Sequence, residues 1–244
     1  MALDQNMLEK LADISTATLT TVLLKKGLRN VWMRGTRPLR SNQPRVAGHA
    51  FTLRFIPVRE DIATPESWSS PRSTRAAIEL MPKGCIAVAD TMGVNNSAIS
   101  GDILCARMKQ RGVNALVTDG VIRDVKGVLA TNFPVWSQGV AAPPSITGLT
   151  FVGWQEPIAC GGVAVYPEDM IVADDDGAVV IPKALLDEVV SAAYDQEQME
   201  SWIMSEVVRG EALLGLYPPN AAAQARYKEA VRKESLTRKR RKLR

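Results

Sequence analysis

The sequence contains only one histidine, His49, among 244 residues. Histidine serves as the base in Ser-His-Asp and Cys-His enzymes, and several histidines or cysteines make the common zinc sites. His49 stands in "AGHAFTL", where we expect a structural residue on a strand. This argues against both classes of site and leaves carboxylates, arginine, lysine, backbone groups or an oxygen-held metal to carry any chemistry.

Cysteines and long apolar runs are also scarce. The three cysteines, Cys85, Cys105 and Cys160, are far apart and form no CxxC motif. This spacing argues against a disulfide framework or a zinc knuckle and favours reduced thiols. No apolar run is long enough to cross a bilayer, and the early acids of "MALDQNMLEKLAD" are not typical of a signal peptide. We therefore expect a cytoplasmic protein with no membrane partner.

The positive charge is confined to one end of the chain. Residues 228–244 hold nine basic residues and two acids, a net charge of +7, so the remaining chain carries −3 and the whole +4. The terminal "RKRRKLR" has no interleaved aromatic residues of the kind that stack on bases. We expect a solvated terminus here and no nucleic-acid partner.

The first third of the chain predicts two helices and one long strand. Residues 13–27 begin with Asp13 and Ser15, end in Gly27 and predict a helix. Residues 28–45 are rich in Arg, Gly and Pro and predict a loop. Alternation in "RVAGHAFTLRFIPV" predicts a strand. A second loop and a short helix near residues 74–80 follow.

The middle of the chain alternates between strands and helices. Short apolar runs at 84–90, 113–120 and 133–139 predict buried strands, and helices are predicted at 101–112 and from residue 123. This order is typical of parallel βαβ units. In such sheets ligands bind at the carboxyl ends of the strands, where the helices begin. Both "SGDIL" and "GVIRD" fall at that edge.

The pattern changes after Pro143-Pro144. Five short runs separated by Gly, Pro and Asp predict a β-rich layer: 150–154, 157–162, 163–167, 170–177 and 178–182. From Lys183 the apolar spacing is helical, and we expect this helix to continue past Trp202 until Tyr217-Pro218-Pro219 breaks it. We predict a catalytic α/β domain at residues 1–182 and a helical arm with a basic tail at 183–244.

Four positions at the strand ends suggest a site. Gly101 allows close approach to a ligand, and the helix that begins at Asp102 offers amide groups to an anion. Arg123 has a planar fork suited to a carboxylate, and Asp124 offers the oxygen ligand that magnesium or manganese accepts. Spacing alone leaves an alternative open, in which Asp102 is only an N-cap and Arg123–Asp124 only a solvated ion pair.

The sequence has Gly101-Asp102, then twenty other residues, then Arg123-Asp124. This pattern resembles the G-D-x20-R-D signature of the class II pyruvate aldolases, whose type member cleaves 4-hydroxy-4-methyl-2-oxoglutarate. The resemblance extends over about residues 46–182 and includes "RGVNALVTDGVIRD", the Cys160-Gly161-Gly162 turn and "IVADDDGAVVIP". These aldolases belong to the RraA-like family, which is named for a ribonuclease regulator. The resemblance implies a swivelling β/β/α domain that assembles as a trimer or a dimer of trimers.

The resemblance also implies roles for individual residues. Backbone groups of Gly101, Asp102, Ile103 and Leu104 would hold the pyruvyl part of an oxoacid substrate. Arg123 would bind the substrate and stabilise the enolate oxygen. Asp124 would anchor Mg²⁺ or Mn²⁺, largely through waters, and Asp102 would orient a water or move protons. Oxaloacetate decarboxylation would be a side activity.

Two parts of the family pattern have no clear counterpart in this sequence. Acidic residues from a neighbouring subunit are expected in such sites, and Glu197 and Glu200 are only candidates. The Arg-rich segment Arg29–Ser73 does not match the aldolases and could line the pocket, so the half of the substrate beyond pyruvate stays open. The alternatives are a binding protein that regulates a ribonuclease and a lyase acting on a sugar-derived oxoacid.

Overall fold

The computed structural model describes residues 5–242, without the side chains of residues 5, 6, 8, 9 and 234–242. The side chains of the basic "RKRRKLR" tail therefore lie outside the described residues. The chain divides into two compact units between Ala192 and Ala193. The boundary that was predicted for the catalytic domain, at residue 182, stays a prediction.

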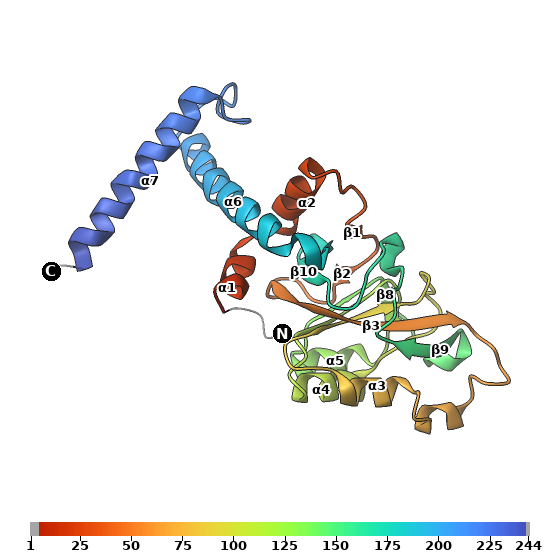
Figure 1. The fold of residues 1–244 in the computed structure, drawn as a ribbon. Helices are drawn as coiled ribbons and strands as arrows, with labels where there is room; N and C mark the ends of the chain where they lie inside the picture. Colours follow the sequence, from red (N-terminus) through yellow and green to blue (C-terminus); the bar gives the residue numbers. More distant parts are fainter. Residues whose placement is uncertain (1–4, 243–244) are drawn as a thin grey trace. The chain divides into compact units, whose positions relative to one another are not determined.

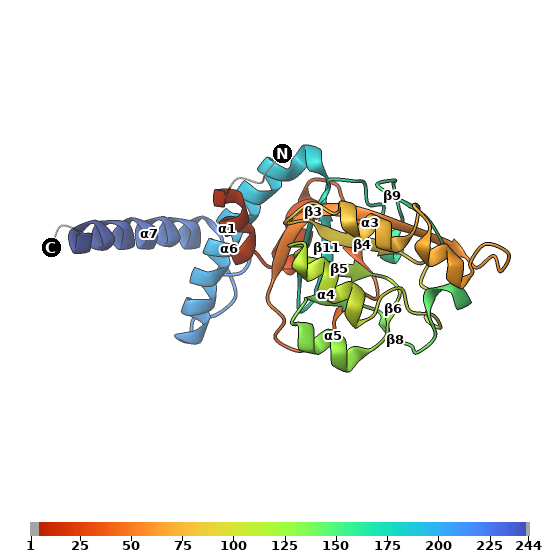
Figure 2. The ribbon, with the colours of Figure 1, turned by 90° about the horizontal axis from the view of Figure 1, so that it is seen from below.

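The first unit is built on a parallel sheet with helices on one face (Figures 1 and 2). Strands β3, β4, β5 and β7 pair in parallel in that order, as the βαβ pattern predicts. Helices α3, α4 and α5 connect successive strands. The bounds are β3 Val46–Pro57, α3 Thr74–Leu80, β4 Ile86–Asp90, α4 Asp102–Gln110, β5 Ala115–Thr118, α5 Val125–Thr131 and β7 Val135–Ser137.

Strands β4, β5 and β7 are buried at every position because both faces of the sheet are covered. In β4, Ala87 and Ala89 face the cluster that contains the helix residues, whereas Ile86 and Val88 face a second apolar cluster. Successive side chains of a strand point to opposite faces, so one five-residue strand supplies both cores. A run such as "IAVAD" is thus typical of a central strand between two layers.

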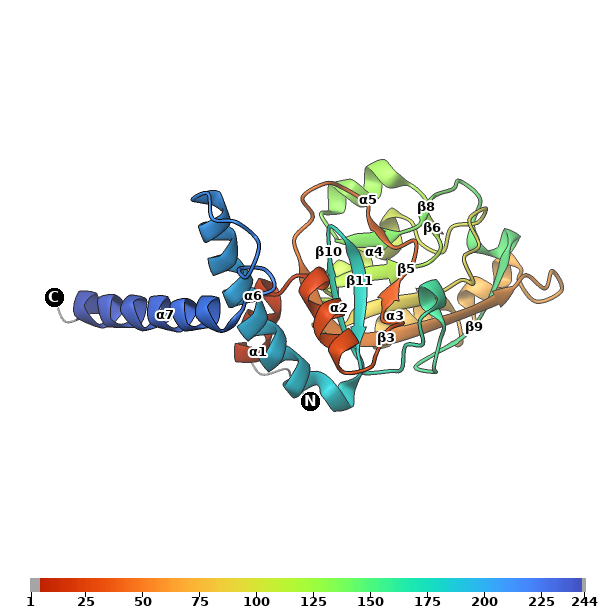
Figure 3. The same cartoon turned by 90° about the horizontal axis from the view of Figure 1, so that it is seen from above.

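An antiparallel layer covers the second face (Figure 3). Strand β10 (Met170–Asp174) pairs with β3, β11 (Gly177–Ile181) with β10, and β1 (Trp32–Met33) with β11. The sheet curls, so that Ile171 and Val180 share a buried cluster with Val88 of the parallel part. This arrangement confirms an α/β fold with a β-rich second layer.

The remaining strands are short and complete the edges of the first unit. Strand β2 pairs with β7, β9 pairs with the outer half of β3, and β6 pairs with β8 in a separate two-stranded sheet. Their bounds are β2 Arg37–Pro38, β6 Val121–Ile122, β8 Gly139–Val140 and β9 Leu149–Trp154. The prediction that residues 28–45 form a loop was therefore wrong at β1 and β2, whose two-residue pairings leave no alternation to detect.

Two other predictions for this unit need correction. Helix α2 (Thr16–Lys25) is shorter than the predicted helix and begins after Ser15, whose hydroxyl accepts from the Thr18 amide at 3.1 Å; α1 (Gln5–Asp13) precedes it. Residues 157–167 form a 3-10 turn at Cys160–Gly162 and one isolated bridge in place of two strands. Gly161, with φ of +57°, sets this turn because extended strands do not contain left-handed residues.

A buried carboxylate ties that turn to the parallel sheet. Asp119 follows β5, and its Oδ1 accepts hydrogen bonds from the amide and hydroxyl of Thr91 at 2.8 and 2.9 Å. Its Oδ2 accepts from the amides of Gly93 and Gly161 at 3.2 and 3.1 Å. Burial raises the pKa of this carboxyl group, although the donated hydrogen bonds oppose the rise. Asp119 therefore joins three loops at the carboxyl edge of the sheet.

The second unit is helical and contains most of α6 (Leu186–Val208) and α7 (Ala221–Lys242). Ile203, Leu216 and Ala223 form its small core. The predicted continuation of this helix past Trp202 is confirmed, but α6 ends at Val208, before the break that was predicted at Tyr217. Gly210 adopts φ of +97° just after the helix and its amide donates to the Val207 carbonyl at 2.9 Å, a typical glycine stop.

Within the described residues, none of the helices combines the length and the apolar character that a membrane span requires.

Candidate functional site

The loops after β4 and β5 are joined by a short backbone ladder that brings the predicted site residues together. Ile99 donates its amide to the Val121 carbonyl at 3.1 Å, and Arg123 donates its amide to the Ser100 carbonyl at 3.0 Å. These bonds fix the start of α4 beside Arg123. The residues that follow β4 and those that follow β5 thus lie side by side, as expected at the carboxyl edge of a parallel sheet.

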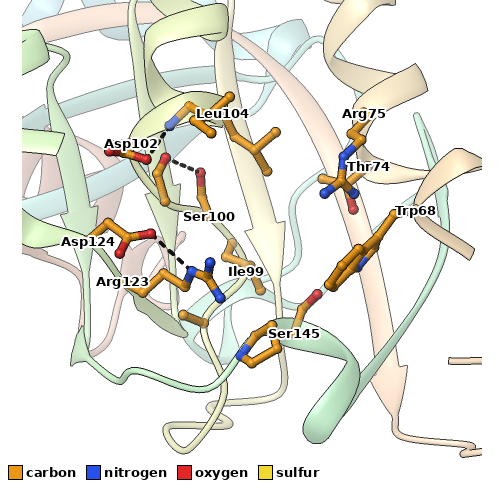
Figure 4. Close-up of a pocket in the computed structure, with 14 residues that line it drawn as sticks. Trp68, Thr74, Arg75, Ile99, Ser100, Asp102, Leu104, Arg123, Asp124 and Ser145 are labelled. Carbon is orange, nitrogen blue, oxygen red and sulfur yellow. Dashed lines mark hydrogen bonds and ion pairs between the residues drawn. The ribbon is translucent and has the colours of Figure 1, made fainter. Parts of the chain in front are cut away.

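All six predicted site residues line one cavity of about 320 Å³. Gly101, Asp102, Ile103 and Leu104 form the wall at the start of α4, and Arg123 and Asp124 lie next to it in Figure 4. A cavity of this size lies at the lower end of the range for small-molecule sites. The sequence predicted that these six residues would lie close together, and in the structure they do.

Asp102 is not the N-cap of α4. Gly101 occupies the cap position in an extended conformation, and Asp102 is the first residue of the helix. The Asp102 Oδ1 atom accepts a hydrogen bond from the Ile103 amide at 2.7 Å. The Cys105 amide is the first in α4 to donate to a carbonyl of the preceding turn, that of Gly101. The amides of Asp102 and Leu104 have no acceptor among the described residues and so can serve a ligand.

Arg123 and Asp124 form an ion pair at the side of the cavity. The Arg123 Nε atom donates to Asp124 Oδ2 at 3.0 Å, while the side chains are 40% and 47% exposed. The pair is therefore open to solvent, and it lines the cavity as well. With Nε engaged, the two Nη groups of Arg123 extend toward the interior of the cavity (Figure 4).

The backbone around Asp124 is unusual for a residue with a side chain. Asp124 lies at φ 54° and ψ 41°, in the left-handed region, immediately before α5. Aspartate tolerates this region better than most residues, and such conformations are found at ligand sites. The turn places the Asp124 carboxylate against Gly101, where an added Cβ would lie 2.6 Å from its Oδ2 atom. Only glycine at position 101 leaves this carboxylate in place.

A second glycine makes room for the other carboxylate. Gly127 lies within α5, and a Cβ there would come within 2.5 Å of Asp102 Oδ2. Sequence reasoning did not select Gly127, although an isolated glycine inside a helical pattern is a signal of close approach. The two glycines hold Asp102 and Asp124 on adjoining walls of the cavity.

None of the residues in the far wall of the cavity was selected from the sequence. This wall is formed by Trp68, Thr74, Arg75 and Ser145 (Figure 4). Trp68 belongs to a 3-10 helix, Pro65–Ser69, inside the Arg-rich segment that did not match the aldolases. The composition of that segment was the only signal that it could line a pocket.

The cysteines take no part in this site as nucleophiles. All three are buried, and burial raises the pKa of Cys85 to about 12 and that of Cys105, beside Ser100, to about 11. Cys160 is shifted upward for the same reason. A thiol with such a pKa stays protonated near neutral pH, and only the thiolate is a strong nucleophile.

Comparison with known sequences gives a family and named relatives. Residues 11–180 match the model of the family described as RraA-like, Aldolase/RraA. A Halalkalibacterium halodurans protein named "Putative 4-hydroxy-4-methyl-2-oxoglutarate aldolase" is 37% identical over 145 residues, 57% of this chain and 68% of that protein. Protein DlpA of Legionella pneumophila is 27% identical over 208 residues. That match covers 85% of this chain but only 32% of DlpA, so the chain spans about a third of that protein.

Two solved structures share the fold over most of their length. An uncharacterized protein from Pseudomonas syringae superposes with a TM-score of 0.76 at 26% identity, covering 89% of this chain and 99% of that one. Streptomyces coelicolor RraAS2, titled an unusual member of the RNase ES inhibitor RraA protein family, superposes with a TM-score of 0.73 at 33% identity. The second match covers 83% of this chain and 97% of RraAS2.

Proposed function

The chain belongs to the RraA-like family, and from this premise we propose that its cavity cleaves a 4-hydroxy-2-oxoacid, such as 4-hydroxy-4-methyl-2-oxoglutarate, to pyruvate and a second oxoacid or aldehyde. The observation that carries the proposal is the convergence of Arg123, the amides that open α4 and two carboxylates on one cavity. The aldolase name of one relative supports a carbon–carbon lyase.

The pyruvyl half of such a substrate needs hydrogen-bond donors for a carboxylate and for a carbonyl oxygen. The amides of Asp102 and Leu104 are suited to the carboxylate because the start of a helix favours negative charge. The Nη groups of Arg123 are suited to the C2 oxygen. The bond from Arg123 Nε to Asp124 holds the plane of the guanidinium, so little rotamer freedom is lost when a substrate binds.

Asp124, with Asp102 close by, is the proposed holder of a divalent cation. Within the part of the chain that the structure describes, no three His, Cys, Asp or Glu side chains gather as a metal cage. One or two carboxylates suit Mg²⁺ or Mn²⁺, which retain several waters. Gly101 and Gly127 leave the space that these carboxylates occupy, so the residues fit such an ion. When bound, the cation would supply Lewis-acid stabilisation of the substrate's C2 oxygen.

The cleavage step requires a proton acceptor and a site for negative charge. The C4 hydroxyl loses its proton, the C3–C4 bond breaks, and its electron pair moves to the C2 oxygen to give the enolate of pyruvate. C4 leaves as the carbonyl of the second product, and the enolate takes a proton at C3. We assign the proton transfers to the carboxylate of Asp102. Arg123 stabilises the charge that develops on the C2 oxygen, and this charge is absent from the ground state.

A chelator assay tests the metal-dependent aldolase directly. We expect pyruvate release from 4-hydroxy-4-methyl-2-oxoglutarate, and slower release from oxaloacetate because decarboxylation passes through the same enolate. Treatment with EDTA should lower both rates by at least about 100-fold, and Mg²⁺ or Mn²⁺ should restore them. Pyruvate added directly controls for the coupling enzyme. Cleavage that EDTA leaves unchanged would exclude the metal-dependent mechanism.

The likeness to RraAS2 supports a second candidate, a protein that binds and inhibits a ribonuclease. This function does not require a carboxylate such as Asp102 inside a cavity. Ribonuclease inhibition by the protein, unchanged in Asp102→Asn and accompanied by no lyase activity on a panel of oxoacids, would favour this candidate. The same panel, extended to sugar-derived oxoacids and ranked by kcat/KM, separates the remaining lyase alternative. The trimer or hexamer stays a prediction that light scattering can test.

Gly127→Ala should displace Asp102 from its place in the cavity. The new Cβ would lie 2.5 Å from Asp102 Oδ2 and 2.7 Å from Asp102 Cβ, so the start of α4 must move away from α5. This clash opposes the preference of a helix for alanine over glycine, which is about 1 kcal/mol, and we expect a lower Tm. We expect kcat of the folded protein to fall about 10- to 100-fold. Lys126→Ala, on the exposed neighbour in the same helix, is the control, and wild-type kcat in Gly127→Ala would exclude the role given to Asp102.

A further inference from the structure

The two ends of the cavity differ in their chemistry. Both carboxylates, Asp102 and Asp124, lie at the end that holds Arg123, whereas the opposite end carries Trp68, Thr74 and Arg75 (Figure 4). Resting on the function proposed above, we propose that Arg75, held by Trp68, binds a second carboxylate at the far end of the substrate. Arg75 is then the residue that selects a dicarboxylic substrate, such as the 4-hydroxy-4-methyl-2-oxoglutarate proposed above, over a monocarboxylic one.

Arg75 has no ion pair with any carboxylate whose side chain the structure describes. Its guanidinium carbon lies 5.0 Å from the centroid of the Trp68 ring. Nearby arginines differ: Arg59 binds Asp61 through two hydrogen bonds, and Arg107 binds Glu79 in the same way. A guanidinium stacked on an aromatic face keeps its N–H edges available, because the ring contacts the plane and not the edge.

Helix stability does not explain a cation at position 75. Arg75 is in the first turn of α3, after Ser73, whose hydroxyl accepts from the Ala76 amide as the N-cap. The partial positive charge at the start of a helix disfavours a cation there. The side chain is exposed on its solvent side, so burial of its stem does not explain it either.

The charge distribution determines which ligand fits both ends. Arg123 is already paired with Asp124, and the amides of Asp102 and Leu104 complete the receptor for one carboxylate. The far end holds the positive charge of Arg75 beside two neutral hydroxyl residues, Thr74 and Ser145. A monocarboxylic oxoacid would present a methyl group to Arg75, whereas a dicarboxylic one would present a matching anion. A charge-assisted hydrogen bond of this kind gives a preference of about 10- to 100-fold.

Two substrates with the same five-carbon chain test the inference. 4-Hydroxy-2-oxoglutarate ends in a carboxylate, and 4-hydroxy-2-oxopentanoate ends in a methyl group. We expect wild-type kcat/KM to be about 10- to 100-fold higher for the first, and Arg75→Met to remove this preference by lowering that value alone. Arg75→Lys should restore part of it. Equal kcat/KM values for the two substrates in the wild type would overturn the inference.

Arg72→Met is the matched control. Arg72 lies three residues earlier, and its Nη2 donates to the Val152 carbonyl at 3.4 Å, outside the lining of this cavity. Its replacement removes the same charge from the same segment. The preference should therefore be unchanged. If Arg72→Met lost as much of the substrate preference as Arg75→Met, the effect would come from the overall positive charge of this segment. That result would overturn a specific contact between Arg75 and the substrate.

Binding measured without turnover distinguishes failure of this inference from failure of the proposed function. Calorimetry with 2-oxoglutarate and 2-oxopentanoate compares the same pair of chain ends. If no hydroxy-oxoacid is cleaved but Arg75→Met weakens only 2-oxoglutarate binding, the aldolase proposal fails and the second anion site stands. If cleavage occurs and Arg75→Met weakens neither ligand, the second site fails and the aldolase stands. If neither ligand binds and nothing is cleaved, both fail.

Discussion

Arg123→Met should lower kcat for pyruvate release by about 100- to 1,000-fold, the range seen when one donor to a developing oxyanion is removed. Methionine keeps the aliphatic stem and removes every N–H group. The loss should appear in kcat more than in KM, because the charge on the C2 oxygen grows only as the C3–C4 bond breaks. Arg123→Lys should lie in between, since lysine keeps the charge without the planar fork.

The control for this experiment is Arg107→Met. Arg107 is on α4, which begins at the site, but its guanidinium binds Glu79 on the outer surface at 2.7 and 2.8 Å. Its loss removes one positive charge from the same helix without touching the cavity. Arg107→Met should keep wild-type kcat. Wild-type kcat in Arg123→Met as well would show that the cavity around Arg123 does not carry the reaction.

Asp119→Ala should destabilise the protein by about 3–5 kcal/mol, the largest effect we expect from a residue outside the cavity. The carboxylate accepts four hydrogen bonds from Thr91, Gly93 and Gly161. Alanine would leave all four donors without this acceptor. Asp119→Asn should cost about 1–3 kcal/mol, because its amide nitrogen leaves at least one buried N–H unpaired in either orientation.

Chemical denaturation of Asp119→Ala, Asp119→Asn and wild type measures this order. Asp175→Ala removes an exposed carboxylate from the β10–β11 turn and should change the free energy of unfolding by no more than about 0.5 kcal/mol. If Asp119→Ala unfolds at the wild-type midpoint, the hydrogen bonds of this carboxylate only offset the cost of burying it. The three loops would then be held together by packing alone.

The candidate site was largely readable from sequence because its parts follow regular elements. The apolar runs before Asp90 and Asp119 predict adjacent parallel strands, and adjacent parallel strands place their following loops side by side. Gly101-Asp102 and Arg123-Asp124 each follow such a strand, so their proximity in one cavity was predictable. The local geometry was not. The cap position of Gly101 and the left-handed backbone of Asp124 depend on the ladder between residues 99–100 and 121–123.

The far wall of the cavity could not be predicted for a different physical reason. Trp68 belongs to the connection between β3 and α3, which has no repeating pattern, so nothing in the sequence indicates that it folds against Arg75 in the first turn of α3. The short apolar runs around the Cys160–Gly162 turn were likewise taken for strands. The apolar residues of this turn are buried because Asp119 and the backbone of Arg34 hold it against the sheet, and such burial looks like a strand in sequence.

The sequence by itself determined the order of the buried parallel strands and of the helices between them, and the meeting of Arg123 with the start of α4. These features follow from hydrophobic periodicity and chain connectivity, which are local properties. Only the tertiary structure decided that Gly127 faces Asp102 and that Arg75 stacks on Trp68 across from Arg123. Contacts of this kind depend on how irregular segments pack against the finished sheet, and that packing depends on the whole fold.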